Sequence, residues 1–122
     1  MASVGDIGLL RTNIADVPVA KIVQQLGTPT YVYDESTILK RIEELRSFDV
    51  IRYAQKACSS LGILDVMRRH GVLVDAVSSG EIHRALKAGY QPSGDPPPIA
   101  YTADIFDREA LDLIVDLGIH AN

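Results

Sequence analysis

The feature that most constrains the fold of this chain is an alternation of strand-like and helix-like segments. The strand-like segments are short and rich in β-branched and aromatic residues, and apolar residues at helical spacing fill the stretches between them. This order predicts a parallel sheet with right-handed crossovers, either open or curved into a barrel. We expect the strands at residues 30–33, 48–55, 72–77, 99–102 and 119–121.

Capping signals define most of the expected helix boundaries. Ser59 or Ser60 can begin one helix, Ser78-Ser79-Gly80-Glu81 has the form of a capping box for the next, and Asp107 can cap a third. Glycines that can end these helices are Gly71, Gly89 and Gly118. The third helix is expected to bury Leu111, Ile114 and Val115.

The first 30 or so residues have a weaker pattern. Apolar residues within 14–26 indicate a short helix that ends at Gly27. Beyond the strand at 30–33, Asp34 and Ser36 are both suitable caps for a helix over 37–46.

Charge and cysteine content narrow the class of protein. The net charge is −4, and no cluster of basic residues is larger than Arg68-Arg69, so neither nucleic acid nor an anionic membrane surface is an expected partner. The single cysteine, Cys58, excludes an internal disulfide and a cysteine-rich zinc site. No window approaches a membrane span. We therefore expect a soluble, cytoplasmic protein with a small-molecule partner.

The last expected strand stands at the very end of the sequence. A terminal strand with no helix to cover it and no further strand to pair with would be an exposed apolar edge. We therefore expect the 122 residues to be the N-terminal part of a longer protein.

The strongest candidate for chemistry is Lys56, at the end of the strand expected over 48–55. Strand alternation places Arg52, Ala54 and Lys56 on one face, and active sites of parallel barrels form at the carboxyl ends of the strands. An amine that is partly desolvated there is a usable nucleophile toward carbonyl groups. The small Ala54 leaves room for a flat ring, and Asp75 interrupts the neighbouring apolar strand near the same level.

Structural alternatives exist for each of these residues. A lysine at a strand end is ordinarily solvated, and Asp75 can equally be a buried carboxylate paired with Arg52 on the adjacent strand. Glu81 is better explained as the reciprocal arm of the capping box than as a catalytic group. Neither His70 nor His83 has the spacing to carboxylates that a metal site needs, so no metal is expected. Cys58 has no histidine placed to activate it.

Three motifs in order carry a resemblance to a known family. They are Tyr31-Val32-Tyr33-Asp34, Tyr53-Ala54-Gln55-Lys56-Ala57-Cys58-Ser59, and Val74-Asp75-Ala76-Val77-Ser78-Ser79-Gly80-Glu81. Together they resemble the N-terminal part of the diaminopimelate decarboxylases, which belong to the alanine-racemase-like, fold-type III group of pyridoxal-phosphate enzymes. The similarity extends from about Gly27 to Asn122.

The resemblance implies a fold and a reaction. Residues 34–122 would form the first part of a (β/α)8 TIM barrel that binds pyridoxal 5'-phosphate, and residues 1–33 would belong to the accessory β domain. Lys56 would form a Schiff base with the cofactor, Asp75 would lie close to the cofactor ring, and Glu81 would help to order the polar groups around the lysine. The complete enzyme would be a homodimer that converts meso-2,6-diaminopimelate to L-lysine.

Other functions are also consistent with these motifs. The phosphate-binding loop and the partner of the pyridine nitrogen lie further along the family's chain, so the 122 residues alone are expected to be inactive. Cys58-Ser59-Ser60 stands where many relatives have asparagine after a small residue, which leaves a decarboxylase or racemase of another basic amino acid as an alternative. A non-catalytic barrel that binds pyridoxal phosphate is a second alternative. An open-sheet nucleotide-binding domain ranks last, because residues 56–62 have no glycine fingerprint.

Overall fold

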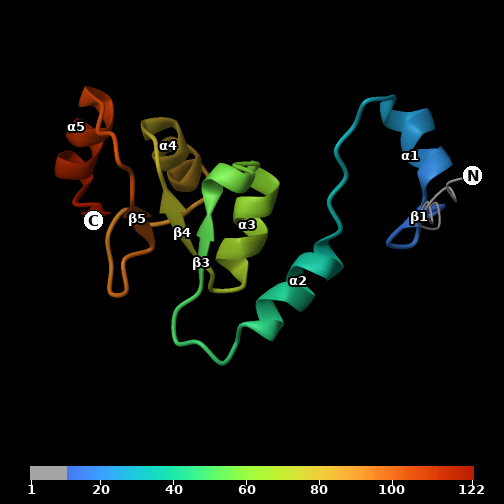
Figure 1. Cartoon of the computed structure of the whole chain (residues 1–122), viewed down its shortest axis with the longest axis horizontal. Coiled ribbons are helices and arrows are strands. Elements are labelled where there is room, and N and C mark those ends of the chain that lie inside the picture. The colour runs from blue at the N-terminus through green and yellow to red at the C-terminus, as the bar shows by residue number, and fades with distance from the viewer. Residues whose placement is uncertain (1–10) are drawn as a thin grey trace, which may run out of the picture. The chain divides into compact units, whose positions relative to one another are not determined.

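The computed structural model describes residues 11–122, which fall into two compact units with a boundary between Arg41 and Ile42 (Figure 1). The first unit contains strands β1 (Asn13–Ile14) and β2 (Val17–Pro18) and helix α1 (Val19–Leu26). Helix α2 (Glu35–Glu44) crosses the boundary. Residues 1–10, and any expectation that concerns them, lie outside the described part of the chain.

The first unit differs from its expected structure in two places. Ile14 and Val17 lie in the antiparallel β1–β2 pair, so the helix begins only at Val19, and it ends before Gly27 as expected. The strand expected at 30–33 was wrong, because these residues find no partner strand in the part of the chain that the structure describes. Tyr31 is accordingly 91% exposed.

Asp34 caps α2, and Ser36 does not. The Oδ1 atom of Asp34 accepts hydrogen bonds from the backbone N–H of Ser36 at 2.9 Å and of Thr37 at 3.4 Å. Side-chain hydrogen bonds from the hydroxyls of Ser36 and Thr37 lower the pKa of Asp34 below its ordinary value. The helix therefore starts two residues earlier than expected, at Glu35.

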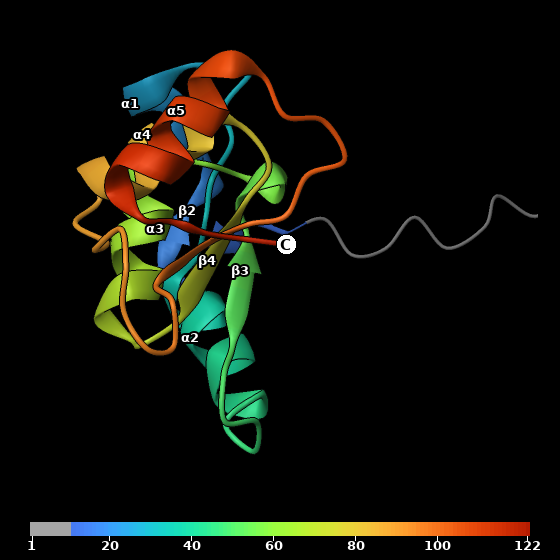
Figure 2. The same ribbon diagram turned by 90° about the vertical axis from the view of Figure 1, so that its left-hand side faces the viewer.

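The second unit is a parallel sheet with helices on one side. Its strands are β3 (Arg52–Ala54), β4 (Leu73–Ala76), β5 (Ile99–Tyr101) and β6 (His120–Ala121), and they pair in this order, all parallel. The connections contain α3 (Leu61–Arg69), α4 (Ser79–Lys87) and α5 (Arg108–Leu117). In Figure 2 these three helices lie on the same side of the strands. The predicted alternation of strands and helices is confirmed.

The hydrophobic core lies between the sheet and the three helices. Every second strand residue faces this side, including Val74, Ala76, Ile99 and Tyr101, each of which is fully buried. The residues that meet them from the helices are Leu64, Ile82, Ala85 and Ala110. The opposite face of the sheet is left without a helix of this unit, and that face is where the candidate site lies.

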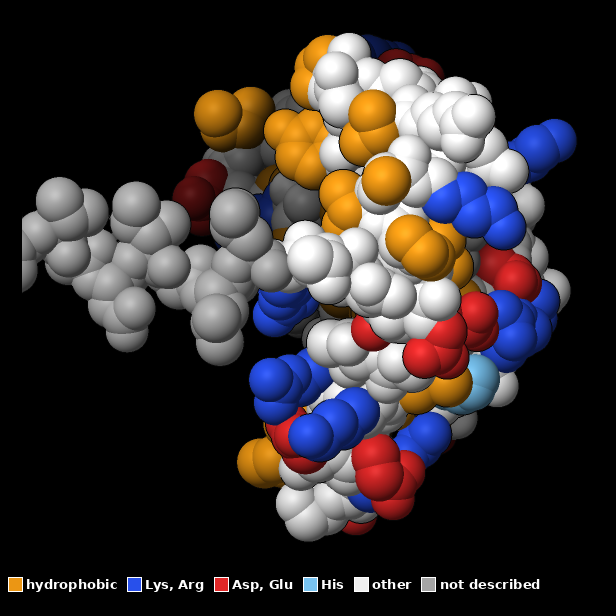
Figure 3. All heavy atoms as spheres, turned by 90° about the vertical axis from the view of Figure 1, so that its right-hand side faces the viewer, with side chains coloured by type: hydrophobic (Ala, Val, Ile, Leu, Met, Phe, Trp, Pro, Cys, Tyr) orange, Lys and Arg blue, Asp and Glu red, His pale blue; other side chains and the backbone are white. Residues whose placement is uncertain are grey.

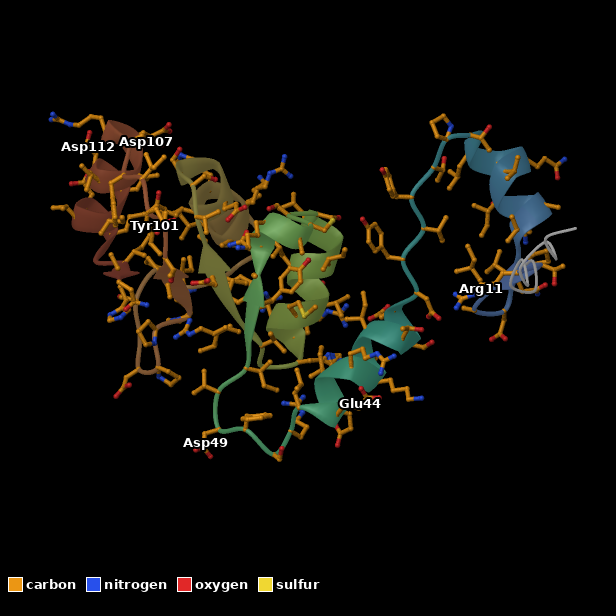
Figure 4. All side chains as sticks on the ribbon, viewed as in Figure 1. Arg11, Glu44, Asp49, Tyr101, Asp107 and Asp112 are labelled. Carbon is orange, nitrogen blue, oxygen red and sulfur yellow. The ribbon has the colours of Figure 1, made fainter. Side chains whose placement is uncertain are left out.

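Two buried tyrosines, Tyr90 and Tyr101, belong to this core. The Tyr90 hydroxyl donates to the carbonyl of Val72 at 2.8 Å, and burial raises the pKa of Tyr90 above its ordinary range. Tyr101 lies on the side of the sheet that faces α5 (Figure 4), and its ring centroid is 5.2 Å from that of Phe106. Burial, followed by the charge of Asp107, raises the pKa of Tyr101.

Helix α5 turns a different face to the core than expected. Leu111 and Val115 are 43% and 78% exposed, so the expectation that both are buried was wrong. Ala110 is buried, and Ile114 is packed against the core. The cap was predicted correctly, because the Asp107 side chain accepts a hydrogen bond of 2.7 Å from the backbone N–H of Ala110 at the start of the helix.

The surface carries exposed apolar side chains. Figure 3 shows them in several groups on one face of the molecule. Large exposed apolar residues of the first unit are Val17, Val23, Leu26, Tyr31, Val32 and Tyr33. Within residues 11–122 no helix has the length and apolar character that crossing a bilayer requires.

Candidate active site

Lys56 lies in a short 3-10 turn immediately after β3. The strand ends at Ala54, and residues Gln55–Ala57 form the turn η1. The expected continuation of the strand to residue 55 was therefore wrong, and strand alternation does not set the direction of the Lys56 side chain. The side chain is exposed, so the described residues do not supply the partial desolvation that we expected for its amine.

The backbone that carries Lys56 is fixed by side chains on several sides. The Tyr53 hydroxyl donates to the carbonyl of Cys58 at 2.9 Å, and the Ser59 hydroxyl donates to the carbonyl of Gln55 at 3.0 Å. From α4, Arg84 donates to the carbonyl of Ser59 at 3.2 Å. Burial raises the pKa of Tyr53, which keeps its hydroxyl available as a donor. The turn thus holds the lysine Cα in place while the amine projects to solvent.

Asp75 stands on the helix-free face of β4, opposite Ala54 of β3 in the parallel register. Its Oδ1 atom accepts a hydrogen bond of 2.7 Å from the Thr102 hydroxyl. Arg52 does not pair with this carboxylate, contrary to the structural alternative, and instead donates to the carbonyl of Val74 at 3.4 Å. Asp75 is half-buried and retains an oxygen that is not engaged by Thr102.

Glu81 acts as a capping residue in this structure. Its backbone N–H donates to the Ser78 hydroxyl at 3.3 Å, and its Oε2 atom accepts from the backbone N–H of Val77 at 2.8 Å. The reciprocal bond of the capping box therefore goes to the residue before Ser78. The carboxylate is engaged at the start of α4, just beyond the carboxyl end of β4.

A hollow of about 380 Å³ lies on the helix-free face of the sheet. Its lining residues are Arg52, Ala54, Asp75, Pro97, Ala100, Thr102, His120 and Asn122. All four strands or their ends contribute to it. Of the predicted site residues only Asp75 is in this lining, and Lys56 and Glu81 are not. Sequence reasoning missed Thr102, His120 and Asn122, although period-two counting from Ala100 along β5 could have found Thr102.

This arrangement suits a ligand with a carbonyl group and a flat body. Ala54 leaves the space beside Asp75 open, and the Asp75 carboxylate can attract a cationic group in the hollow. The exposed Lys56 amine, two residues beyond Ala54, is a nucleophile that can react with a carbonyl carbon. Within the described residues no group of three histidine, cysteine or acidic side chains is arranged to hold a metal ion.

Residues 35–122 match the family model described as pyridoxal-dependent decarboxylase, pyridoxal binding domain. Diaminopimelate decarboxylase of Streptomyces coelicolor is 59% identical over 96 residues, which are 79% of this chain and 22% of that protein. A crystal structure of a diaminopimelate decarboxylase superimposes with a TM-score of 0.80 at 47% identity, covering 84% of this chain and 24% of that one.

The enzyme of Helicobacter pylori, solved in complex with L-lysine, is similar with a TM-score of 0.71 at 31% identity. The superimposed region covers 82% of this chain and 26% of the Helicobacter pylori chain. The chain therefore spans about a quarter of the relatives it matches, and it corresponds to their N-terminal part. The expected fold is confirmed: the parallel sheet and its helices are the first part of a TIM barrel.

Proposed function

The chain belongs to the pyridoxal-dependent decarboxylase family, and we propose that it is the part of a diaminopimelate decarboxylase that anchors pyridoxal phosphate through Lys56. The observation that carries this proposal is the position of Lys56 in the turn at the carboxyl end of the first sheet strand, where Tyr53, Ser59 and Arg84 fix the backbone. Barrel enzymes assemble their active sites at this end of the strands.

The roles of the individual residues follow from their chemistry. When bound, pyridoxal phosphate supplies an electron sink for the negative charge that loss of CO2 leaves on the substrate. Lys56 Nζ provides the amine that anchors the cofactor aldehyde, and as a free amine it can hold a proton beside the reacting carbon. Asp75 provides a carboxylate for the cofactor ring. Glu81 has the weaker role of ordering the backbone at Val77.

The proposed substrate is meso-2,6-diaminopimelate, and the proposed product is L-lysine. The names of the relatives support this choice, and the L-lysine complex of the Helicobacter pylori enzyme agrees with a long diamino acid as ligand. A decarboxylase or racemase of another basic amino acid is the second candidate, since Cys58-Ser59-Ser60 departs from the asparagine of many relatives. A non-catalytic pyridoxal-phosphate-binding barrel is the third.

The proposal extends to the organisation of the complete protein. Residues 1–33 would belong to an accessory β domain and residues 34–122 to the cofactor-binding barrel. The complete protein would be a cytoplasmic homodimer, and the 122 residues alone would be inactive because the remaining strands supply the cradle for the cofactor phosphate. The chain covers 22% of one relative and 24% of another, which supports the proposal that further strands complete the barrel.

Activity of the complete protein tests this function. Purified protein with pyridoxal phosphate should release CO2 from meso-2,6-diaminopimelate and form L-lysine, with much lower rates on L-lysine, L-ornithine and L-arginine. Lys56→Ala should abolish the reaction, whereas Lys87→Ala, at an exposed position of α4, should leave it unchanged. Faster turnover of another basic amino acid would favour the second candidate. Cofactor binding without turnover of any of these would favour the third.

A further inference from the structure

Thr102 connects the end of β5 to the carboxylate of β4. Its hydroxyl lies 2.7 Å from Asp75 Oδ1, the short distance of a hydrogen bond to a charged oxygen. We propose that Thr102 is a positioning residue for the decarboxylation, one that acts by orienting the Asp75 carboxylate toward the cofactor. The proposal rests on the function proposed above.

The register of the sheet explains why these two side chains meet. Asp75 pairs with Ala100, and Thr102 is two residues further along the chain, so both side chains project from the same face. The backbone N–H of Thr102 donates to the carbonyl of Ala76 at 2.9 Å, which continues the ladder just past β5. The threonine Cα is thereby fixed, and a β-branched side chain has few rotamers in an extended segment.

The bond to Thr102 leaves the second oxygen of Asp75 available. No other described residue forms a hydrogen bond with this carboxylate, and the facing position on β3 is only Ala54. With Oδ1 held by the hydroxyl, the Oδ2 atom is the one that can meet a donor in the hollow. Without the hydroxyl, the carboxylate is free to rotate about its Cβ–Cγ bond, because terminal sp³–sp² torsions are broad.

Four variants of the complete holoenzyme separate positioning from simple structural support. Thr102→Val removes the hydroxyl and keeps the shape, Thr102→Ser keeps the hydroxyl, and Asp75→Asn alone and with Thr102→Val form a double-mutant cycle. We expect kcat to fall about tenfold in Thr102→Val, as the loss of one hydrogen bond to a charged group would give, and to recover largely in Thr102→Ser. Thr30→Val, at an exposed position of the first unit, is the matched control.

The double variant and the cofactor spectrum give the decisive readouts. Because Thr102 acts through Asp75, adding Thr102→Val to Asp75→Asn should cause no further loss, and Thr102→Val should shift the absorption spectrum of the bound cofactor. Crystal structures of the cofactor-free Thr102→Val and Thr102→Ser proteins should show a rotated Asp75 carboxylate in the first only. Equal losses in Thr102→Val and Thr102→Ser, or multiplied losses in the double variant, would overturn the proposal.

Borohydride labelling of Lys56 distinguishes a failure of the proposal about Thr102 from a failure of the proposed function. If reduction with borohydride labels Lys56 in the unchanged protein, and Thr102→Val has the kcat, spectrum and Asp75 orientation of that protein, the inference about Thr102 alone is wrong. If Lys56 is not labelled in the unchanged protein, the proposed function fails and this inference fails with it.

Discussion

Ala54 of β3 and Asp75 of β4 stand opposite each other in the parallel register, so the side chain directly across from this carboxylate on β3 is a methyl group. Both residues line the same hollow on the helix-free face of the sheet. In the proposed site, Ala54 would therefore leave the space for a cofactor ring, and Asp75 would provide the carboxylate beside that ring.

Enlarging Ala54 should block this space. Ala54 is exposed, so the side chain of Ala54→Leu enters the hollow and leaves the core untouched. We expect pyridoxal-phosphate binding by the complete protein to weaken about tenfold or more, since overpacking costs about 1–3 kcal/mol. Spectroscopic titration measures the affinity. Ala20→Leu, at an exposed position of α1, is the control, and equal affinities of the two variants would contradict a ring site above Ala54.

Removing the cap of α5 should destabilise that helix locally. Asp107→Ala loses the hydrogen bond of 2.7 Å to Ala110 N–H, which is worth about 1 kcal/mol. Amide hydrogen exchange in the first turn of α5 should accelerate about fivefold. Asp112→Ala, which removes only an exposed pair with Arg108, should change exchange little. Figure 4 shows both aspartates. Similar exchange in the two variants would argue against the cap.

Alkaline pH should destabilise the second unit through Tyr90. An unfolded tyrosine ionises near pH 10, and burial raises the pKa of Tyr90 in the folded state. The unfolded state therefore releases its proton first. The stabilising contribution is complete below about pH 10 and is lost as the pH rises toward the folded pKa.

Tyr90→Phe tests this linkage. The variant should lose about 1 kcal/mol of stability near pH 7, because the bond to the Val72 carbonyl is absent, and should show a smaller fall above pH 10. Urea unfolding of the complete protein at several pH values measures both the loss of stability near pH 7 and the fall above pH 10. Tyr31→Phe, at an exposed ring, is the control. An unchanged alkaline slope in Tyr90→Phe would contradict the assignment.

The 122-residue polypeptide, prepared by itself, should self-associate. Among residues 11–122, no strand pairs with the outer edges of β3 and β6, no helix of the second unit covers one face of the sheet, and Leu111 and Val115 on α5 are exposed. Sedimentation velocity over a range of concentrations should show oligomers or aggregates. Val115→Lys should reduce the association partially. A monomer with a cooperative unfolding transition would contradict this expectation.

Sequence reasoning succeeded where local signals and burial act together. The apolar run from Val72 to Val77, interrupted only by Asp75, predicted a buried strand, and Asp107 and Gly118 marked the ends of α5. These elements depend on periodicity and caps that a single sequence displays. The parallel sheet followed from their order.

Other features depend on long-range pairing, which a sequence does not display. The β-branched and aromatic residues 30–33 have strand propensity but no partner strand among the described residues, so they form no strand. Lys56 was placed on the strand because nothing local distinguishes its end from the 3-10 turn that follows Ala54. The partner of Asp75 was missed because Thr102 is adjacent only through the register of β4 with β5.

Chemical mapping of the modified lysine decides whether Lys56 anchors the cofactor. The complete protein is incubated with pyridoxal phosphate, reduced with borohydride and digested, and the modified residue is identified by mass spectrometry. We predict one label per chain, on Lys56, and none in Lys56→Arg, with Lys21, Lys40 and Lys87 unmodified. A label on any other lysine, or no label at all, would show that Lys56 is not the anchor.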